Sequence, residues 1–355
     1  MRPYQVYLSE THDPWANLAF ESYLLEHSDP ETPILFLWRN TPTVVIGRAQ
    51  NPWLECHLDL MQHHQVKLAR RISGGGAVYH DLGNMNFSFI DTPESFNKQK
   101  NLELIAITLL HLGIQAYSSG RNDLEILTPE PRKISGSAFR ETKTRCLHHG
   151  TLLIHADLTA LSQYLNPSPK KLQAKGVTSV RARVANLSEF SPHITPPLVQ
   201  DQLLKTLSRT YDLKPLLVFD PTRLQAFPHP EFFQAQHLLF SSHHWLYGRT
   251  LPFTHEIHAR HALGEIRLHM FIENQIIIDI EGYTDDLTPE PFLKFCDALK
   301  GQCYSRQALQ ALLMQAPGLS ESLRGCLEGV LDQEVAEITA EQYGQTALPS
   351  SSGAI

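Results

Sequence analysis

The chain has 355 residues, of which 42% are hydrophobic and 19% charged, and its formal net charge is −7. This length and composition can bury a sizeable core and predict one large domain with a smaller one. The acidic balance argues against a general nucleic-acid binder. No apolar run approaches the roughly 20 residues that span a bilayer, and the amino terminus lacks a signal peptide's apolar stretch. We therefore expect a cytoplasmic protein that binds neither nucleic acid nor membranes.

The cysteines and histidines do not form a recognisable metal or disulfide pattern. Five cysteines are odd in number and widely scattered, with no Cys-x-x-Cys, so we expect free thiols. The 19 histidines show no His-Glu-x-x-His spacing. We do not expect histidine to hold a metal.

The amino-terminal half alternates a few helices with short strands. A helical stripe of apolar residues over 16–26 follows Pro14, and a second helix is expected over 101–112, ending at Gly113. Strands are expected at 34–38, 43–46, 66–68, 76–79 and 86–90. Because these strands are short and closely spaced, we expect an antiparallel sheet.

Further elements continue to the carboxyl-terminal part. Strands are expected at 123–127, 133–137 and 150–155, and a helix at 197–211, whereas the pattern blurs over 217–244. A new unit is expected from about Tyr247, with strands at 265–272 and 275–281 and helices near 290–299, 305–313 and 319–338. The predicted domains are 1–246 and 247–344, and residues 345–355, rich in Ser, Gly and Ala, are expected to be disordered.

The most informative motif is a run of three glycines, Gly74, Gly75 and Gly76, between two strand-like segments. Backbone N–H groups in such a loop can cradle phosphate oxygens. Arg70 and Arg71 add planar cationic groups that suit phosphate or carboxylate. Taken alone, the run also fits a glycine-rich hairpin with a solvated arginine pair, because it matches neither the P-loop nor the dinucleotide fingerprint.

Several motifs together resemble one family. They are Arg-Arg-Ile-Ser-Gly-Gly-Gly-Ala-Val-Tyr-His at 70–80, Gly-Arg-Asn-Asp at 120–123, Lys-Ile-Ser-Gly-Ser at 133–137, His-His-Gly-Thr at 148–151 and Lys-Gly-Val-Thr-Ser-Val-Arg at 175–181. In order and spacing they resemble the bacterial lipoate–protein ligases. The resemblance is dense over about residues 4–190 and loose beyond.

This resemblance implies an α+β catalytic domain of the biotin/lipoate ligase type, with a mixed sheet like that of class II aminoacyl-tRNA synthetases. Residues 1–246 would be that domain, followed by a small α+β accessory domain. The implied reaction uses ATP and Mg²⁺ to convert free (R)-lipoate to lipoyl-adenylate and pyrophosphate. The lipoyl group then passes to a lysine on an acidic acceptor domain, in 2-oxoacid dehydrogenase E2 subunits or the glycine cleavage H protein. We expect a monomer.

The resemblance also implies site residues. Lys133 is the expected catalytic residue, because its ammonium can bridge the lipoate carboxylate and an α-phosphate oxygen. Asp123 is a Mg²⁺ ligand candidate, although residues 122–123 also suit a turn with local hydrogen bonds. The expected ATP-binding groups are the backbone of Gly76, Ala77, Val78 and Tyr79 and the residues Arg71, Asn122, Asp123 and Lys133. The expected lipoate-binding residues are Arg70, Ser73, Gly75, Lys133, Arg140 and His149, with Gly150 also considered for the lipoate or nucleotide pocket. Trp38 and Val45 suit either an apolar tail pocket or ordinary core packing.

Residues 169–183 contain five basic residues and no acidic one. They are expected to form a mobile, cationic lid that excludes water from the adenylate, with Lys175, Gly176, Ser179 and Arg181 as its adenylate-binding residues. The same segment also fits a solvated basic surface.

Other functions remain open at this stage. A lipoyl or octanoyl transferase of the same fold would need a cysteine to hold a thioester. The octanoyltransferases have a similar segment with Cys after the Asn-Pro dipeptide, whereas in this chain Ser168 follows Asn166-Pro167. An amidotransferase that uses a preformed adenylate and a catalytically silent binder of lipoyl domains are further alternatives. The sequence does not distinguish octanoate from lipoate as the substrate.

Overall fold

The chain folds into two units, described here from a computed structural model. The structure describes residues 2–119, 123–126, 130–165, 184–248, 252–261 and 264–335. The first unit is Met1–Arg48 with Leu54–Phe240, and the second is Ala49–Trp53 with Ser241–Ile355. The short segment Ala49–Trp53 thus belongs with a part of the chain that lies almost 190 residues later, a long-range association that order along the chain does not reveal. Residues 345–355, the predicted tail, lie outside the described residues.

A mixed sheet of eight strands organises the first unit, in the order β11-β1-β2-β6-β10-β9-β8-β7. β1 runs parallel to β2 and β11, and the other neighbours are antiparallel. A second sheet has the order β4-β3-β5, with β3 parallel to β4. The strands are β1 (Gln5–Ser9), β2 (Ile34–Trp38), β3 (Thr43–Ile46), β4 (Lys67–Arg70), β5 (Val78–His80), β6 (Asn84–Asp91), β7 (Ala116–Ser119), β8 (Asp123–Ile126), β9 (Arg132–Glu141), β10 (Cys146–Leu153) and β11 (Leu217–Phe219).

The expectation of one antiparallel sheet is wrong. The predicted bounds of β2 and β3 are confirmed, but these two strands lie in different sheets. Two short helices, α2 (Pro52–Glu55) and α3 (Leu58–His63), separate β3 from β4. This crossover carries the chain back so that β4 runs parallel to β3, which a tight hairpin does not permit.

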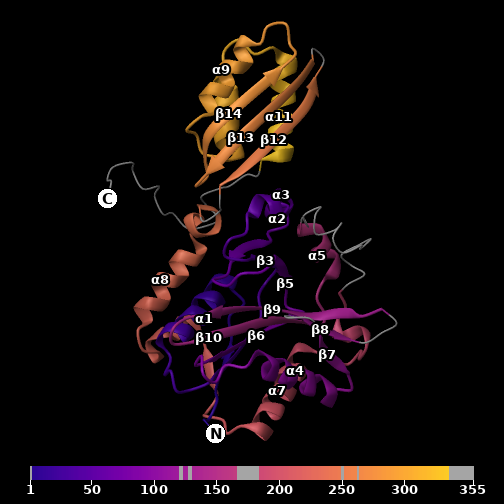
Figure 1. The fold of residues 1–355 in the computed structure, drawn as a ribbon, viewed down its shortest axis with the longest axis vertical. Coiled ribbons are helices and arrows are strands. Elements are labelled where there is room, and N and C mark those ends of the chain that lie inside the picture. The colour runs from indigo at the N-terminus through magenta and orange to yellow at the C-terminus, as the bar shows by residue number, and fades with distance from the viewer. Residues whose placement is uncertain are drawn as a thin grey trace. The chain divides into compact units, whose positions relative to one another are not determined.

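Helices cover the large sheet, and several have clear start signals. α1 (Pro14–His27) begins at the N-cap Asp13, whose carboxylate accepts the Ala16 N–H, and has proline at its first position. α4 (Lys98–His111) and α7 (Pro196–Thr210) lie together on one side of the sheet (Figure 1). The remaining helices of this unit are α5 (Leu158–Tyr164), the 3₁₀ turns η2 (Leu187–Glu189) and η3 (Pro221–Ala226), and α8 (Pro230–Ser241). η3 and α8, together with β11, lie within residues 217–244, where the sequence predicted no clear elements.

The alternation of β6 separates the core from the site. Met85, Phe87 and Phe89 belong to the core cluster that α4 and α7 complete. Because successive side chains of a strand point to opposite faces, Asn86 and Ser88 project from the other face of the sheet. Both are nonetheless buried, which places polar groups inside the first unit.

The second unit has its own sheet and core. β12 (Phe253–His261), β13 (Gly264–Glu273) and β14 (Ile276–Thr284) form an antiparallel sheet. It packs with α9 (Glu290–Leu299), α10 (Arg306–Gln315) and α11 (Glu321–Glu334) around a separate hydrophobic cluster. A short π-helical turn, η4 (His244–Gly248), precedes this sheet. In the part of the chain that the structure describes, every helix is too short or too polar to cross a membrane.

Candidate active site

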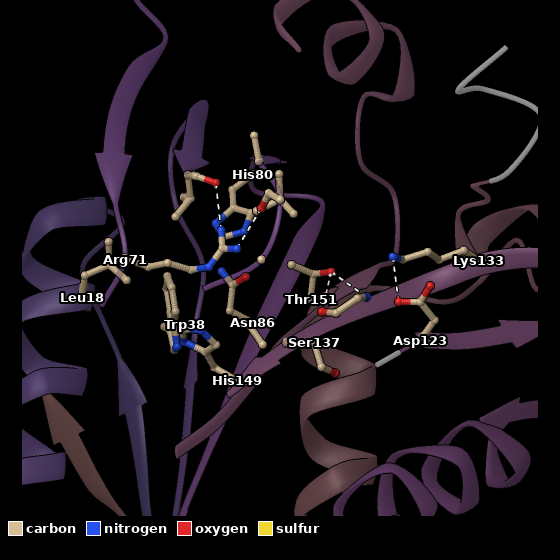
Figure 2. Close-up of a pocket in the computed structure, with 18 residues that line it drawn as sticks. Leu18, Trp38, Arg71, His80, Asn86, Asp123, Lys133, Ser137, His149 and Thr151 are labelled. Atoms are coloured by element: carbon tan, nitrogen blue, oxygen red, sulfur yellow. Dashed lines mark hydrogen bonds and ion pairs between the residues drawn. The ribbon is translucent and has the colours of Figure 1, made fainter. Parts of the chain in front are cut away.

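A cavity of about 240 Å³ lies in the first unit, between the large sheet and the loop of three glycines. Leu18, Trp38 and Val45 give it an apolar part. Lys133 and Asp123 line it at the other side, as Figure 2 shows. The cavity is therefore amphipathic, with an apolar part for a hydrocarbon-rich group and a charged part for a polar group.

A row of residues from five neighbouring strands forms one wall of the cavity. Trp38 of β2 lies opposite Asn86 of β6, and Asn86 lies opposite Thr151 of β10. The Gly136 N–H of β9 donates to Thr151 Oγ1 at 3.3 Å, and Gly136 lies opposite Asp123 of β8. Since directly opposed residues share a face of the sheet, this register alone brings the apolar part and the charged part together.

Lys133 and Asp123 form an ion pair at the charged side. Lys133 Nζ lies 2.8 Å from Asp123 Oδ1, and each side chain is about a third exposed. A Cβ on Gly136 would lie 3.0 Å from both Cε and Nζ of Lys133. The glycine therefore leaves room for the ammonium to lie against the strand.

The glycine loop is held by Arg71. Arg71 Nη2 donates to the carbonyls of Gly74 and Gly76 at 2.6 and 2.8 Å, and Nη1 donates to the Val45 carbonyl at 3.1 Å. Gly75 adopts φ +91°, a conformation that a side chain disfavours. Burial lowers the pKa of Arg71 to about 10, against the opposing effect of the Glu21 carboxylate, and the side chain stays charged near neutral pH. Arg71 thus fixes the shape of the loop.

A chain of buried hydrogen bonds connects the apolar part to this loop. Trp38 Nε1 donates to Ser88 Oγ at 3.0 Å, and Ser88 Oγ donates to Glu21 Oε1 at 2.5 Å. Both Glu21 oxygens lie 2.9 Å from His149 Nδ1, and His149 Nε2 lies 2.6 Å from Ser73 Oγ. Because a carboxylate only accepts, His149 Nδ1 donates to Glu21, which fixes the orientation of the imidazole ring.

The structure places many of the predicted residues in one lining. The predicted residues that line the cavity are Trp38, Val45, Arg71, Gly75, Gly76, Ala77, Val78, Asp123, Lys133, His149 and Gly150. Ser73 is not among the lining residues but bonds to two of them, Arg71 and His149. Their roles toward ATP or lipoate remain predictions.

Three further predicted residues are not among those that line the cavity. Arg70 is fully buried, and its Nη1 donates to the Arg48 carbonyl at 2.9 Å. Tyr79, predicted to contact ATP through its backbone, packs its ring against that of Tyr164 with centroids 5.7 Å apart. Arg140 Nη1 donates to the Ile72 carbonyl at 3.2 Å. The predicted residues Asn122, Lys175, Gly176, Ser179 and Arg181 lie outside the described residues.

Sequence reasoning missed several residues of the site. Glu21 is a charged residue on a helix whose neighbouring positions are buried, and Asn86 and Ser88 alternate with aromatic residues along one strand. Polar residues at such buried positions are a signal that the sequence alone offers, because isolated buried polar groups are costly. His80, Thr151 and Leu18 also line the cavity, without a signal of this kind.

Family models identify the class of protein to which this mixed sheet, with its lysine–aspartate pair beside a glycine-rich loop, belongs: a lipoyl protein ligase catalytic domain. Residues 13–208 match the lipoyl protein ligase A/B catalytic domain. Residues 250–326 match the bacterial lipoate protein ligase C-terminus.

Individual relatives agree. The chain is 45% identical over 322 residues to lipoate-protein ligase A of Bdellovibrio bacteriovorus, covering 90% of this chain and 94% of the relative. It is similar to the structure of P. falciparum LipL1 in complex with lipoate, at 29% identity and TM-score 0.60, covering 92% of this chain and 98% of the other. It is also similar to lipoate-protein ligase A bound with ATP, at 26% identity and TM-score 0.54, covering 69% and 98%. The chain therefore belongs to the lipoate–protein ligase A family, and the predicted family and α+β fold class are confirmed.

Proposed function

We propose that this protein activates free (R)-lipoate with ATP as lipoyl-adenylate and transfers the lipoyl group to a lysine of lipoyl acceptor domains. The observation that carries the proposal is the single cavity that joins Trp38 and Val45 to the Lys133–Asp123 pair beside the glycine loop. An acyl tail with a terminal carboxylate matches this succession of apolar and charged lining. The relatives described as bound to lipoate and to ATP support the same pair of ligands.

The first half-reaction joins two anions. A carboxylate oxygen attacks the α-phosphorus, the phosphoanhydride bond breaks, and pyrophosphate leaves. Cationic donors are needed where negative charge accumulates on the phosphoryl oxygens. In this proposal the Lys133 ammonium exchanges its contact with Asp123 for the carboxylate and an α-phosphate oxygen, which its position at the cavity wall favours.

The second half-reaction uses the same charge. The neutral ε-amine of the acceptor lysine attacks the acyl carbon of the adenylate, an amide bond forms, the acyl–phosphate bond breaks, and AMP leaves with loss of a proton from nitrogen. Lys133 then stabilises the oxyanion on the acyl oxygen. One residue therefore serves both steps.

The glycine loop suits phosphate. The carbonyls of Gly74 and Gly76 point to Arg71, and the described residues contain no cis peptide bond. Because a trans peptide holds its N–H opposite its carbonyl, the N–H groups of Gly75 and Ala77 point away from Arg71. This geometry supports the predicted anion cradle, with Arg71 acting on its shape.

Asp123 fits a nucleotide-borne Mg²⁺. Mg²⁺ usually takes one or two carboxylates together with phosphates and waters. Asp123 offers one carboxylate at the cavity wall, and among the described residues no group of three acidic, histidine or cysteine side chains suits a metal. We propose that Asp123 holds Mg²⁺ when MgATP binds, where the ion neutralises phosphate charge.

The transferase alternative lacks a suitable nucleophile. All five cysteines lie among the described residues, and none lines the cavity. Burial raises the pKa of Cys56 above its ordinary value, with the Glu55 carboxylate acting in the same direction, which disfavours a thiolate. A reaction through an adenylate needs no covalent acyl-enzyme. The positions of the cysteines therefore favour the ligase reaction over the cysteine-dependent transferase reaction.

Acceptor and location are part of the proposal. A structure of the ligase and E2 lipoyl domain of Thermoplasma acidophilum, 28% identical with TM-score 0.58, supports acceptor domains of that kind. We propose that residues 247–344 act as the accessory domain and that the protein works in the cytoplasm as a monomer.

Pyrophosphate release tests the proposal. The purified protein with lipoate and MgATP, but no acceptor, is expected to release pyrophosphate, and added lipoyl domain is expected to gain the lipoyl group. Full-rate acyl transfer from an acyl-carrier protein without ATP would refute the ligase assignment.

A further inference from the structure

Two buried polar side chains near Trp38 have atoms that no protein group satisfies. His80 Nε2 and Asn86 Nδ2 are buried without a hydrogen-bond partner, and both residues line the cavity. His80 is 3% exposed and Asn86 is 1% exposed. Figure 2 shows both on the side of Trp38, away from Lys133. An unpaired buried polar group is uncommon in a folded protein and calls for a physical explanation.

The hydrogen-bond network fixes the proton on His80. The Asn17 side-chain nitrogen donates to the Arg39 carbonyl at 3.1 Å, and it also donates to Asn40 Oδ1 at 3.0 Å. Asn40 Nδ2 therefore faces His80 Nδ1, at 3.1 Å, and donates to it. A neutral imidazole that accepts at Nδ1 carries its proton at Nε2.

The imidazole of His80 stays neutral. Burial, and then the charges of Arg71 and His149, lower the pKa of His80 to about 3. Its Nε2–H is therefore a fixed, uncharged donor, buried on a residue that lines the cavity. A fixed donor of this kind can select a ligand because the protein does not have to reorganise to offer it.

Asn86 supplies the second group. Its Oδ1 accepts from Asn84 Nδ2 at 3.0 Å, which leaves Nδ2 without a protein acceptor. Register places Asn86 directly opposite Trp38, and the rings of Trp38 and His80 lie 5.9 Å apart. The apolar part of the cavity thus contains two N–H donors and is not uniformly hydrocarbon-like.

We propose that His80 and Asn86 make this cavity select lipoate over octanoate, the saturated acid of the same chain length. The inference rests on the proposed function, in which the acyl tail lies near Trp38 and its carboxylate near Lys133. The dithiolane ring carries two sulfur atoms, which are weak hydrogen-bond acceptors, whereas an alkyl tail offers none. An octanoyl tail in this part of the cavity leaves both donors unpaired, whereas a dithiolane sulfur can accept from them, and sites built to donate hydrogen bonds discriminate against ligands that lack the acceptor.

The test compares two acids and two matched substitutions. Adenylation is followed by pyrophosphate release without acceptor protein, with lipoate and with octanoate, in the full chain. The Asn86→Leu variant keeps the number and branching of the side-chain heavy atoms and removes the unpaired Nδ2, together with the Oδ1 that accepts from Asn84. The Thr151→Val variant removes a neighbouring hydroxyl that already has a partner, the Gly136 N–H.

The expected result is a change in the ratio of kcat/KM for lipoate to kcat/KM for octanoate. The unsubstituted protein prefers lipoate by about tenfold in kcat/KM, a ratio that corresponds to one modest hydrogen bond. In Asn86→Leu this preference falls by at least threefold, mainly because octanoate improves, since an apolar wall now faces the alkyl tail. Thr151→Val is expected to change kcat/KM for the two acids by the same factor, so that their ratio is unchanged.

Several results would overturn the proposal. An unchanged ratio in a folded Asn86→Leu variant, or no preference in the unsubstituted protein, would remove these donors from substrate selection. If Asn86→Leu does not fold, Asn86→Ser and the binding affinities of both acids for it provide the same comparison. If neither acid supports pyrophosphate release with MgATP, the proposed function itself fails, a different outcome from equal use of both acids.

Discussion

Gly136 lies against the end of the Lys133 side chain, three residues earlier in the same strand, β9. A Cβ at position 136 would approach Lys133 Cε and Nζ at 3.0 Å and Asp123 Oδ1 at 3.9 Å. Contacts of 3.0 Å are tighter than normal packing, so the flexible ammonium has to move. The absence of one methyl group therefore sets the position of the charge on which the proposed chemistry depends.

We predict that Gly136→Ala lowers the rate of adenylation about tenfold while the protein still folds, because the methyl group displaces the end of a flexible chain and not a backbone group. Pyrophosphate release measures the rate, and thermal unfolding measures the fold. Gly325→Ala is the matched control, since a Cβ there meets open space. Full adenylation by Gly136→Ala would show that the position of the ammonium is not critical.

Lys133→Ala is predicted to slow both half-reactions by about 10² to 10³, the range for loss of one preorganised donor. Lys133→Arg should recover little of this loss, because a planar guanidinium does not replace a compact ammonium. Lys133 is about a third exposed, so neither variant is expected to unfold. Single-turnover transfer from added lipoyl-adenylate separates the second step from the first. Near-normal rates in both steps would exclude Lys133 as the main charge stabiliser.

Local patterns predicted much of the fold but not the connections between its parts. The strands 34–38 and 43–46 were predicted with their observed bounds, since each is a short apolar run bordered by turn residues. Their separation into two sheets was not predicted, because strand partners depend on long-range pairing. β11 was missed because only three residues form it, and two of those are exposed.

The site shows the same division. The motif residues that the family resemblance identified, such as Arg71, Asp123 and Lys133, do meet at one cavity. Arg70 was expected at lipoate, yet its guanidinium is buried and donates to the Arg48 carbonyl. The sequence alone does not distinguish two adjacent arginines, but in extended backbone successive side chains point to opposite sides. Glu21 was missed because its importance depends on a partner, His149, that lies 128 residues away.

We predict that Glu21→Ala lowers the free energy of unfolding by about 3 kcal/mol, because removing one member of a buried pair leaves the other without a partner. Glu21 is fully buried and accepts from Ser88 and His149. Glu26→Ala, in the same helix but exposed, should change stability by less than about 0.5 kcal/mol. Denaturant unfolding measures both variants, and equal values for the two would contradict a structural role for the Glu21 contacts.

Cysteine is predicted to be dispensable. The Cys56→Ala, Cys146→Ala double variant should retain most of its ligase turnover, since both thiols are buried and lie outside the cavity lining. Any loss is expected to follow stability, because two small buried side chains are shortened. A stably folded double variant without turnover would instead indicate a covalent acyl-enzyme.

His148 is predicted to make the protein sensitive to acid. It is fully buried, its ring centroid lies 4.5 Å from that of Phe139, and its Nδ1 bonds to Asn101. Burial, and then the charges of His149 and Lys98, lower its pKa to about 3. An unfolded histidine has a pKa of about 6.5. Between these values the unfolded chain binds a proton that the folded protein does not.

The stabilising contribution of neutral His148 is therefore complete above about pH 6.5 and decreases as the pH falls toward 3. Each such proton changes the free energy of unfolding by about 1.4 kcal/mol per pH unit, and His80 adds a change of the same sign. His148→Phe should reduce the pH slope between about pH 6 and pH 4, whereas the exposed control His193→Phe should not. Denaturant unfolding at several pH values measures these slopes. An unaltered slope in a folded His148→Phe variant would show that His148 is protonated in the folded protein as easily as in the unfolded chain.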